Sequence, residues 1–147
     1  MILAADIGGT KTNVALFERQ NGRVMAQHER SFPSQQYPSL EAILQEFLKG
    51  HTVQLTGACF GIAGPVADGR SKTTNLPWDA DVKRLQRTLK LKTIGLINDL
   101  AATAYGIQAL PEEAFAVLNP GQAQPRGAVA VIAAGTGLGE ASLFWDG

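Results

Sequence analysis

The first 31 residues contain short runs that have the length of β-strands and no helical period, and two of them, MILAA and VALFE, are apolar. Three such runs lie at residues 2–6, 13–18 and 24–31. The glycine-containing turn GGTKT joins the first two runs, and the dipeptide Asn21-Gly22, a strong hairpin signal, joins the second and third. These short connections predict a three-stranded antiparallel meander at the start of the fold.

The pattern then changes to the period of a helix. Apolar residues near one face of this predicted helix are Leu40, Ile43, Leu44, Phe47 and Leu48. Ser39 precedes them as a candidate N-cap, and Gly50 follows them as a stop. A second helix is expected where Val82, Leu85 and Leu89 share a face, with Asp79 as its cap.

The remaining segments complete the predicted order of elements. A strand is expected within 56–64, a long loop of turn-forming composition over 64–78, a strand over 93–98 that runs directly into a helix over 99–110, and two final strands within 128–147. The order β-β-β-α-β-α-β-α-β-β mixes hairpins with β-α-β crossovers. It therefore predicts an α/β fold with a mixed β-sheet and helices packed on its faces.

Composition limits the class of partner. With 147 residues the chain fits one domain, and its 13 basic and 13 acidic residues cancel without a lysine or arginine cluster suited to nucleic acid or an anionic membrane. Small-molecule partners are expected.

The single cysteine, Cys59, is expected to pack as a small hydrophobe in a reducing cytoplasm. No apolar stretch has the roughly 20 residues of a membrane helix, and the N-terminus lacks the features of a signal peptide.

The segment DIGGTKT resembles the end of a nucleotide-binding P-loop but lacks the spacing G-x-x-x-x-G-K-[ST], and strands flank it on both sides. We interpret it as a hairpin turn in which Gly8 and Gly9 take positive φ and let a phosphate approach the backbone, with the Thr10 hydroxyl as a further donor. A plain turn is the alternative. Asp6 ends an apolar strand, where a buried carboxylate needs a partner or a cation.

A second glycine-rich turn lies between the last two strands and contains Gly135, Thr136, Gly137 and Gly139. Its spacing does not fit the dinucleotide fingerprint G-x-G-x-x-G. Two such hairpins could bind a polyphosphate from two sides if their strands shared one sheet. Structural glycine turns are the alternative.

Asn98 and Asp99 lie at the junction of a predicted strand and helix. A lone Asp at this position is most simply a helix cap. The pair with Asn98 favours a second interpretation, because transfer of a phosphoryl group to a sugar hydroxyl needs a base for the proton and an amide that binds hydroxyls.

Five segments together resemble the bacterial glucokinases of the hexokinase and actin-like ATPase superfamily, which has a ribonuclease H-like fold. These segments are DIGGTKTNVAL, CFGIAGPV, TNLPW, INDLAATAYG and AGTGLGEASLFWDG, and they span nearly the whole chain. The resemblance implies phosphorylation of glucose at the 6-hydroxyl by ATP, with both glycine hairpins on the ATP phosphates and Asp6 orienting Mg²⁺ through water. It also implies Asp99 as general base, Asn98 and Asn75 as sugar ligands, and Trp78 as a wall of the sugar pocket or a core residue.

Family members continue into a second domain that carries a Glu-x-x-His sugar motif. Neither His28 nor His51 stands in that context. We therefore expect residues 1–147 to be the N-terminal small domain of a two-domain sugar kinase, with the C-terminal domain absent, no activity on its own and possible self-association as a homodimer. A sugar-responsive regulator of the ROK type and an actin-like or chaperone-like ATPase are the alternatives. The first would need a DNA-binding segment, and IND and TNLPW argue against the second.

Overall fold

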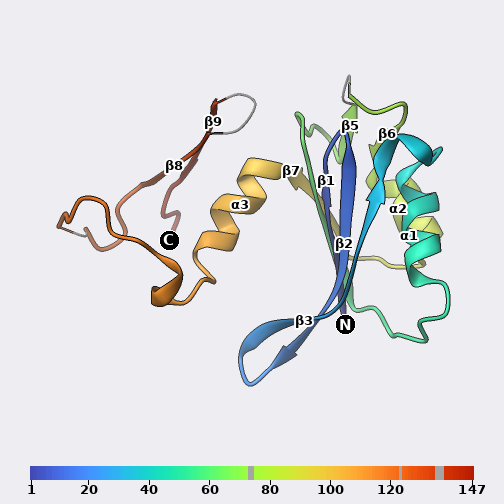
Figure 1. The fold of residues 1–147 in the computed structure, drawn as a ribbon, viewed down its shortest axis with the longest axis horizontal. Helices are drawn as coiled ribbons and strands as arrows, with labels where there is room; N and C mark the ends of the chain where they lie inside the picture. Colours follow the sequence, from blue (N-terminus) through green and yellow to red (C-terminus); the bar gives the residue numbers. More distant parts are fainter. Residues whose placement is uncertain (73–74, 123, 135–137) are drawn as a thin grey trace. The chain divides into compact units, whose positions relative to one another are not determined.

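The computed structural model describes residues 1–72, 75–122, 124–134 and 138–147. They form two compact units, Met1–Asp99 and Leu100–Gly147. The first unit contains a five-stranded sheet and a small two-stranded one, and the second contains a two-stranded sheet (Figure 1).

The five-stranded sheet has the order β3-β2-β1-β4-β7. Strands β1 (Ile2–Ile7), β2 (Lys11–Gln20) and β3 (Arg23–Pro33) are antiparallel neighbours, which confirms the predicted meander. Strands β4 (Gly57–Ile62) and β7 (Ile94–Asn98) extend the sheet on the other side of β1 and run parallel to it. The sheet is therefore mixed, as the order of elements predicted.

Helices α1 (Leu40–Leu48) and α2 (Val82–Leu89) both contribute to the core against one face of this sheet (Figure 1). Side chains alternate along β1, so that Leu3, Ala5 and Ile7 are buried while Asp6 between them is exposed. The largest fully buried apolar side chains are Leu3, Ile7, Val14, Leu16, Phe32, Leu40, Ile43, Leu44, Phe60, Ile62 and Leu85. All of them belong to the Met1–Asp99 unit.

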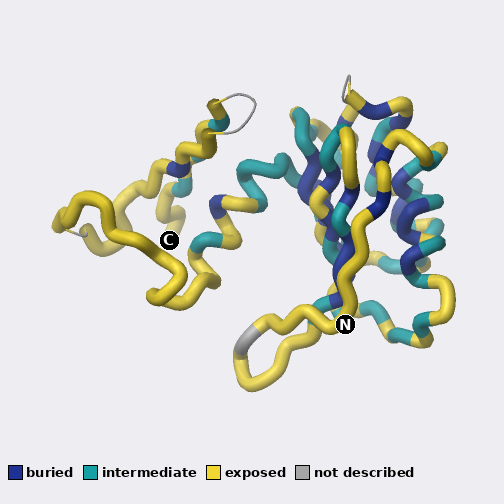
Figure 2. The backbone as a smooth tube through the Cα atoms, viewed as in Figure 1, coloured by how far each residue is buried: buried dark blue, intermediate teal, exposed yellow. Residues whose placement is uncertain are grey.

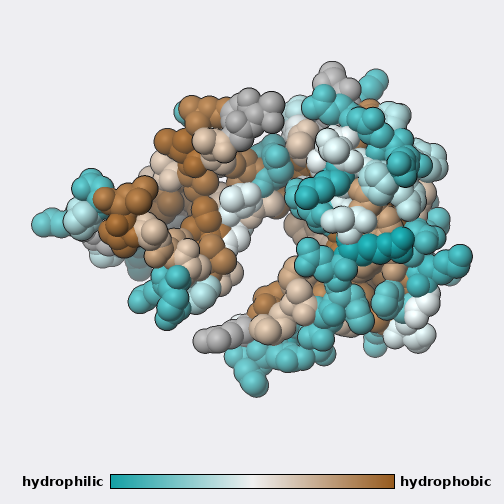
Figure 3. Space-filling model, viewed as in Figure 1, coloured by the Kyte–Doolittle hydropathy of each residue, from teal (hydrophilic) through white to brown (hydrophobic). Residues whose placement is uncertain are grey.

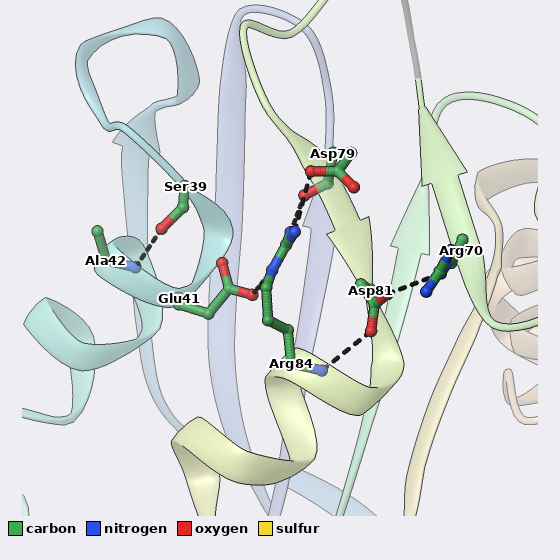
Figure 4. Close-up of polar contacts among 7 residues, drawn as sticks. All are labelled: Ser39, Glu41, Ala42, Arg70, Asp79, Asp81 and Arg84. Atoms are coloured by element: carbon green, nitrogen blue, oxygen red, sulfur yellow. Dashed lines mark hydrogen bonds and ion pairs between the residues drawn. The ribbon is translucent and has the colours of Figure 1, made fainter.

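The start of α1 agrees with the sequence prediction, and the start of α2 does not. The Ser39 hydroxyl accepts a hydrogen bond from the Ala42 amide at 3.2 Å, as an N-cap does. For α2 the cap is Asp81, whose carboxylate accepts from the Arg84 amide at 3.0 Å (Figure 4). The prediction of Asp79 as cap was wrong because residues 79–81 form a strand, which delays the helix by two residues.

That strand is β6 (Asp79–Asp81), and it pairs antiparallel with β5 (Arg70–Lys72). Strand β5 lies within the segment 64–78 that was predicted to be a loop, and β6 directly follows that segment. The Arg70 guanidinium donates to the Asp81 carboxylate at 2.7 Å. The hydrogen bond from the Arg84 amide, followed by the charge of Arg70, holds the pKa of Asp81 below its ordinary value.

Arg84 joins the two helices of this unit. Its Nε donates to Glu41 of α1 at 2.8 Å, and its Nη1 donates to Asp79 of β6 at 3.1 Å (Figure 4). These bonds, of which the one to Glu41 has the largest effect, raise the pKa of the Arg84 guanidinium. The arrangement fixes α2 against α1 on the core face of the sheet.

The Leu100–Gly147 unit is much less buried. It contains the remainder of α3 (Asp99–Ile107), the 3-10 turn η2 (Glu112–Ala114), and strands β8 (Val129–Ala134) and β9 (Leu138–Leu143), which pair antiparallel. Among its described residues, the buried apolar side chains are Ala104 and Val131 (Figure 2). Large apolar side chains gather on its surface (Figure 3); they are Tyr105, Leu110, Phe115, Val117, Leu118, Val129, Ile132, Leu138, Phe144 and Trp145.

Cys59 differs from its prediction as a buried hydrophobe. It lies on β4 between two buried residues, so that its side chain points to the face opposite the helices, and the residue is exposed. Its sulfur lies against Gly95 of the neighbouring strand, and this partial burial raises the pKa of the thiol. The exposure of Cys59 is therefore set by the alternation of side chains along β4 and not by the apolar residues around it in the sequence.

Candidate functional site

Three parallel strands of the Met1–Asp99 unit end at the same edge of the sheet. Gly8 follows β1, Ala63 follows β4, and Asp99 follows β7. The Ala63 amide donates to the Ile7 carbonyl at 3.0 Å, and the Asn98 side-chain amide donates to the Gly64 carbonyl at 3.1 Å. The carboxyl edge of parallel strands is where open α/β sheets bind ligands. The fold thus brings the first glycine turn and the Asn98-Asp99 pair to one candidate site.

The first glycine turn (Gly8, Gly9 and Thr10) connects β1 to β2. The Gly8 amide donates to the Lys11 carbonyl at 3.0 Å, which closes the turn. Neither glycine has a positive φ, so the prediction that they take the left-handed region was wrong. Gly9 is needed for space instead, because a Cβ there would lie 2.8 Å from the Asn75 Cβ and 3.3 Å from the Asn75 carbonyl oxygen.

Side chains of the 3-10 turn η1 (Ser34–Gln36) donate hydrogen bonds to the Gly8 and Gly9 carbonyl groups of this turn. The Ser34 hydroxyl donates to the Gly8 carbonyl at 2.7 Å, and the Gln35 side-chain amide donates to the Gly9 carbonyl at 3.3 Å. In a trans peptide the next residue's N–H points opposite to the carbonyl. Since the chain has no cis peptide bonds among its described residues, the Gly9 and Thr10 amides face away from η1.

These two amides are donors without an acceptor among the residues that the structure describes. Within the part of the chain that the structure describes, neither the Gly9 nor the Thr10 amide makes a hydrogen bond to the protein. Successive amides that point the same way form a concavity suited to an anion. The turn therefore has the geometry of a small anion site, which the glycine pattern alone did not establish.

Asp6 lies on the solvent-facing side of β1, one residue before the end of the strand. The expectation that its carboxylate is buried was wrong, because the alternation of β1 turns it away from the core. The Asn13 side-chain amide donates to the Asp6 carboxylate at 3.5 Å, and the Ser31 hydroxyl donates in turn to Asn13. Over the described ranges no three His, Cys, Asp or Glu side chains come together as a metal site. A carboxylate alone suits an ion that keeps most of its water, as Mg²⁺ does.

The predicted sugar-side residues Asn75 and Trp78 lie in different environments. Asn75 is exposed and lies against Gly9. Trp78 is only 8% exposed, belongs to the core cluster, and donates from Nε1 to the Ser34 carbonyl at 3.2 Å. The core packing that the sequence left open for Trp78 is therefore present, and its role as a pocket wall stays a prediction. Thr73 and Thr74 of the same motif lie outside the described residues.

Asp99 is the first residue of α3 and directly follows the last residue of β7. The simpler interpretation, in which the Asp99 side chain caps this helix, stays a prediction. Asn98 and Asp99 thus stand at the carboxyl edge that the first glycine turn shares. Their assignment as sugar ligand and base stays a prediction.

The second glycine turn is only partly described. Gly135, Thr136 and Gly137 lie outside the described residues. Gly139 lies in β9, where an added Cβ would lie 3.1 Å from Leu100 Cδ2. Strands β8 and β9 form a sheet of their own, which differs from the expectation that both hairpins could extend one sheet.

Two features of the structure were missed from sequence. Ser34 and Thr12 carry buried hydroxyls beside the first glycine turn, and only their positions after folding give them a role. Lys83, Arg87, Lys90 and Lys92 line one shallow depression beside α2, a local grouping that the even charge balance conceals. The helices of the described residues include none long and apolar enough to cross a membrane.

The comparisons with known proteins agree with this architecture. A sequence profile of the glucokinase family matches residues 3–147. The glucokinase of Nostoc punctiforme is 42% identical over 149 residues, covering all of this chain and 44% of that protein. The glucokinase of Synechocystis is 39% identical over 156 residues and is likewise covered to 44%. The chain spans less than half the length of these curated relatives.

Solved structures show the same fold. The crystal structure of a glucokinase from an Antarctic psychrotroph matches with a TM-score of 0.88 at 32% identity, covering 97% of this chain and 46% of that one. A ROK family glucokinase from Streptomyces griseus, solved in complex with glucose and AMPPNP, matches with a TM-score of 0.67 at 21% identity over 97% of this chain and 44% of that one, which supports the fold alone. With a family profile that covers nearly all of its length, this chain belongs to the glucokinase family.

Proposed function

We propose that this chain supplies the general base and the first phosphate-binding turn of an enzyme that phosphorylates glucose at its 6-hydroxyl with ATP. The observation that carries the proposal is the shared sheet edge: β1 and β7 end side by side with β4, and their ends present the first glycine turn and Asp99. Membership of the glucokinase family supplies the reaction class.

In the proposed reaction the 6-hydroxyl oxygen of glucose forms a bond to the γ-phosphorus of ATP, and the bond from that phosphorus to the β,γ-bridging oxygen breaks. The hydroxyl proton passes to the Asp99 carboxylate. Asn98 and Asn75 bind sugar hydroxyls through amides that both donate and accept. The products are glucose 6-phosphate and ADP.

The outward-facing amides of Gly9 and Thr10 would bind phosphate oxygens, since they have no acceptor within the described protein. Gly135, Thr136, Gly137 and Gly139 of the second turn would contact the phosphates as well. Mg²⁺, held by Asp6 through water, would neutralise phosphate charge as the bond to the leaving group breaks. The exposed position of Asp6 suits a water-mediated contact.

The chain by itself is expected to be inactive. Kinases of this kind enclose sugar and nucleotide between two walls to exclude water and align the reacting atoms. The described sheet edge is one wall only, and the chain covers 44% of the Nostoc punctiforme relative.

A chimera tests the proposal. This chain replaces the matching part of the Nostoc punctiforme glucokinase, and a coupled assay measures glucose phosphorylation by the chimera and by the 147-residue chain alone. We expect activity from the chimera and none from the lone chain above an Asp99→Asn preparation, which controls for host kinases. A folded but inactive chimera would contradict the proposed function. An active lone chain would contradict the need for a second wall.

A further inference from the structure

Ser34 is bonded through every polar group that it has. Its hydroxyl donates to the Gly8 carbonyl at 2.7 Å, its amide donates to the Thr10 carbonyl at 3.0 Å, and its carbonyl accepts from Trp78 Nε1 at 3.2 Å. The residue is 0% exposed. One buried residue therefore contacts both the first glycine turn and the segment that ends at Trp78.

The orientation of the Ser34 hydroxyl follows from counting protons. A hydroxyl has one proton, and a carbonyl can only accept, so the Ser34 proton lies on the bond to Gly8. The Thr12 hydroxyl, 2.9 Å from Ser34 Oγ, must then be the donor of the bond between the two side chains. Thr12 is also 0% exposed. The Ser34 hydroxyl is thus fixed by a second buried group and cannot turn away from the glycine turn without leaving a buried donor unpaired.

This fixed bond determines where the anion-binding amide points. The Gly8 carbonyl and the Gly9 amide belong to one trans peptide, so holding the carbonyl toward Ser34 holds the N–H toward the opposite side. If the Ser34 hydroxyl were lost, the peptide plane would be free to rotate and the Gly9 amide would lose its fixed direction. Preorganised donors bind an anion better than donors that must first be ordered.

Ser34 also connects the turn to the sugar-side segment. The Trp78 ring is held by the Ser34 carbonyl, while Asn75 of the same segment lies against Gly9. A shift of the glycine turn on binding a phosphate is therefore expected to reach the Trp78 indole through Ser34. The indole N–H becomes a reporter of the occupancy of the turn.

We propose that Ser34 is a positioning residue that aims the Gly9 amide at a bound phosphate and joins the glycine turn to Trp78. The proposal rests on the proposed function, in which the first glycine turn binds ATP phosphates. Nothing in the sequence pattern marks Ser34, because it lies between the third strand and the first helix, outside every glycine motif.

The test is a titration of the ¹⁵N-labelled 147-residue chain with inorganic pyrophosphate, followed by NMR. In the wild type we expect the Gly9 and Thr10 amide signals and the Trp78 indole signal to shift together, with Trp145 as the indole that reports general salt effects. In Ser34→Ala the dissociation constant for pyrophosphate should rise about five-fold, which corresponds to the free energy of one hydrogen bond. The Trp78 indole should still shift on saturation, because its bond is to the Ser34 main-chain carbonyl, which alanine keeps.

Thr12→Val is the matched control. It also removes one buried hydrogen bond, yet it leaves the Ser34 proton on the Gly8 carbonyl. A loss of thermal stability similar to that of Ser34→Ala, with pyrophosphate affinity near that of the wild type, would show that Ser34 acts by aiming the amide and not by general stabilisation. If Ser34→Ala does not fold, Ser34→Cys, which keeps a weak donor, should give an intermediate affinity.

The outcomes separate the two proposals. Equal pyrophosphate affinity in folded Ser34→Ala and wild type would overturn the role of Ser34 while leaving the glycine turn as the phosphate site. An unmoved Trp78 indole in a wild type whose turn amides do shift would overturn the connection to the sugar-side segment. Wild-type turn amides that do not respond to pyrophosphate would overturn the phosphate role of the turn, and the role of Ser34 with it.

Discussion

Replacing Gly9 by alanine tests whether the first glycine turn and the Asn75 segment are packed as the structure has them. The added Cβ would lie 2.8 Å from the Asn75 Cβ, whereas ordinary contacts begin near 3.4 Å, so one group must move by 0.6 Å, the difference of the two distances. Backbone strain contributes nothing, because Gly9 does not have a positive φ.

Overpacking of this kind typically costs about 1–3 kcal/mol, which lowers the melting temperature of a unit the size of Met1–Asp99 by roughly 4–8 °C per kcal/mol. Thermal unfolding of Gly9→Ala measures this loss. Gly106→Ala is the matched control, because the methyl group that it adds in α3 meets nothing within 4 Å. We expect the control to unfold at or above the wild-type temperature, since alanine is the better helix former.

A double variant decides the cause. Adding Asn75→Gly to Gly9→Ala removes the side-chain carbon that the new methyl meets, so we expect most of the lost stability to return. The reasoning is refuted if Gly9→Ala stays within about 0.5 kcal/mol of the wild type, the usual range of surface substitutions, or if Asn75→Gly fails to compensate. In the chimera the same contact predicts that Gly9→Ala raises the KM for glucose as well as the KM for ATP.

Two further predictions concern the stability of the chain. Because the pKa of Asp81 is lowered in the folded protein, its charge contributes stability above its unfolded pKa of about 3.9, and this contribution is lost as the pH falls through the folded pKa. Asp81→Asn should therefore be less stable than the wild type to urea at pH 7, with a difference that narrows below about pH 4; a difference that stays constant with pH would contradict the assignment. Hydrogen exchange should be slow in the strands and helices of Met1–Asp99 and fast in β8 and β9, because the fully buried apolar side chains belong to the first unit. Equal protection in both units would contradict this difference.

The sequence predicted the meander, α1, the parallel strands and the order of elements because each depends on local periodicity and turn residues. Asn21-Gly22 formed the expected turn with both residues at positive φ, and Ser39 formed the expected cap. The error in the cap of α2 has another cause, which is strand pairing that the local pattern does not show. Asp79 was assigned from its proximity to a helix, but the pairing of β6 with β5, a contact distant from the helix pattern, moved the cap to Asp81.

The site shows the same division between local and long-range information. The glycine motif identified the first glycine turn, but the reason for its glycine at position 9 is Asn75, 66 residues later in the chain. The hydroxyl of Ser34, which orients the turn, carries no local signal at all. The Asp6 carboxylate was expected to be buried at the end of its strand because its neighbours are apolar, while the alternation of β1 points it outward.

The most direct test of the account is the turnover of Asp99→Asn in the chimera with the Nostoc punctiforme glucokinase. Asparagine can occupy the first position of α3 but cannot accept the hydroxyl proton, so we expect kcat to fall about 10²- to 10⁴-fold with unchanged melting temperature and glucose affinity. Turnover within a few-fold of the wild-type chimera would contradict Asp99 as the general base and leave it a residue of the helix start alone.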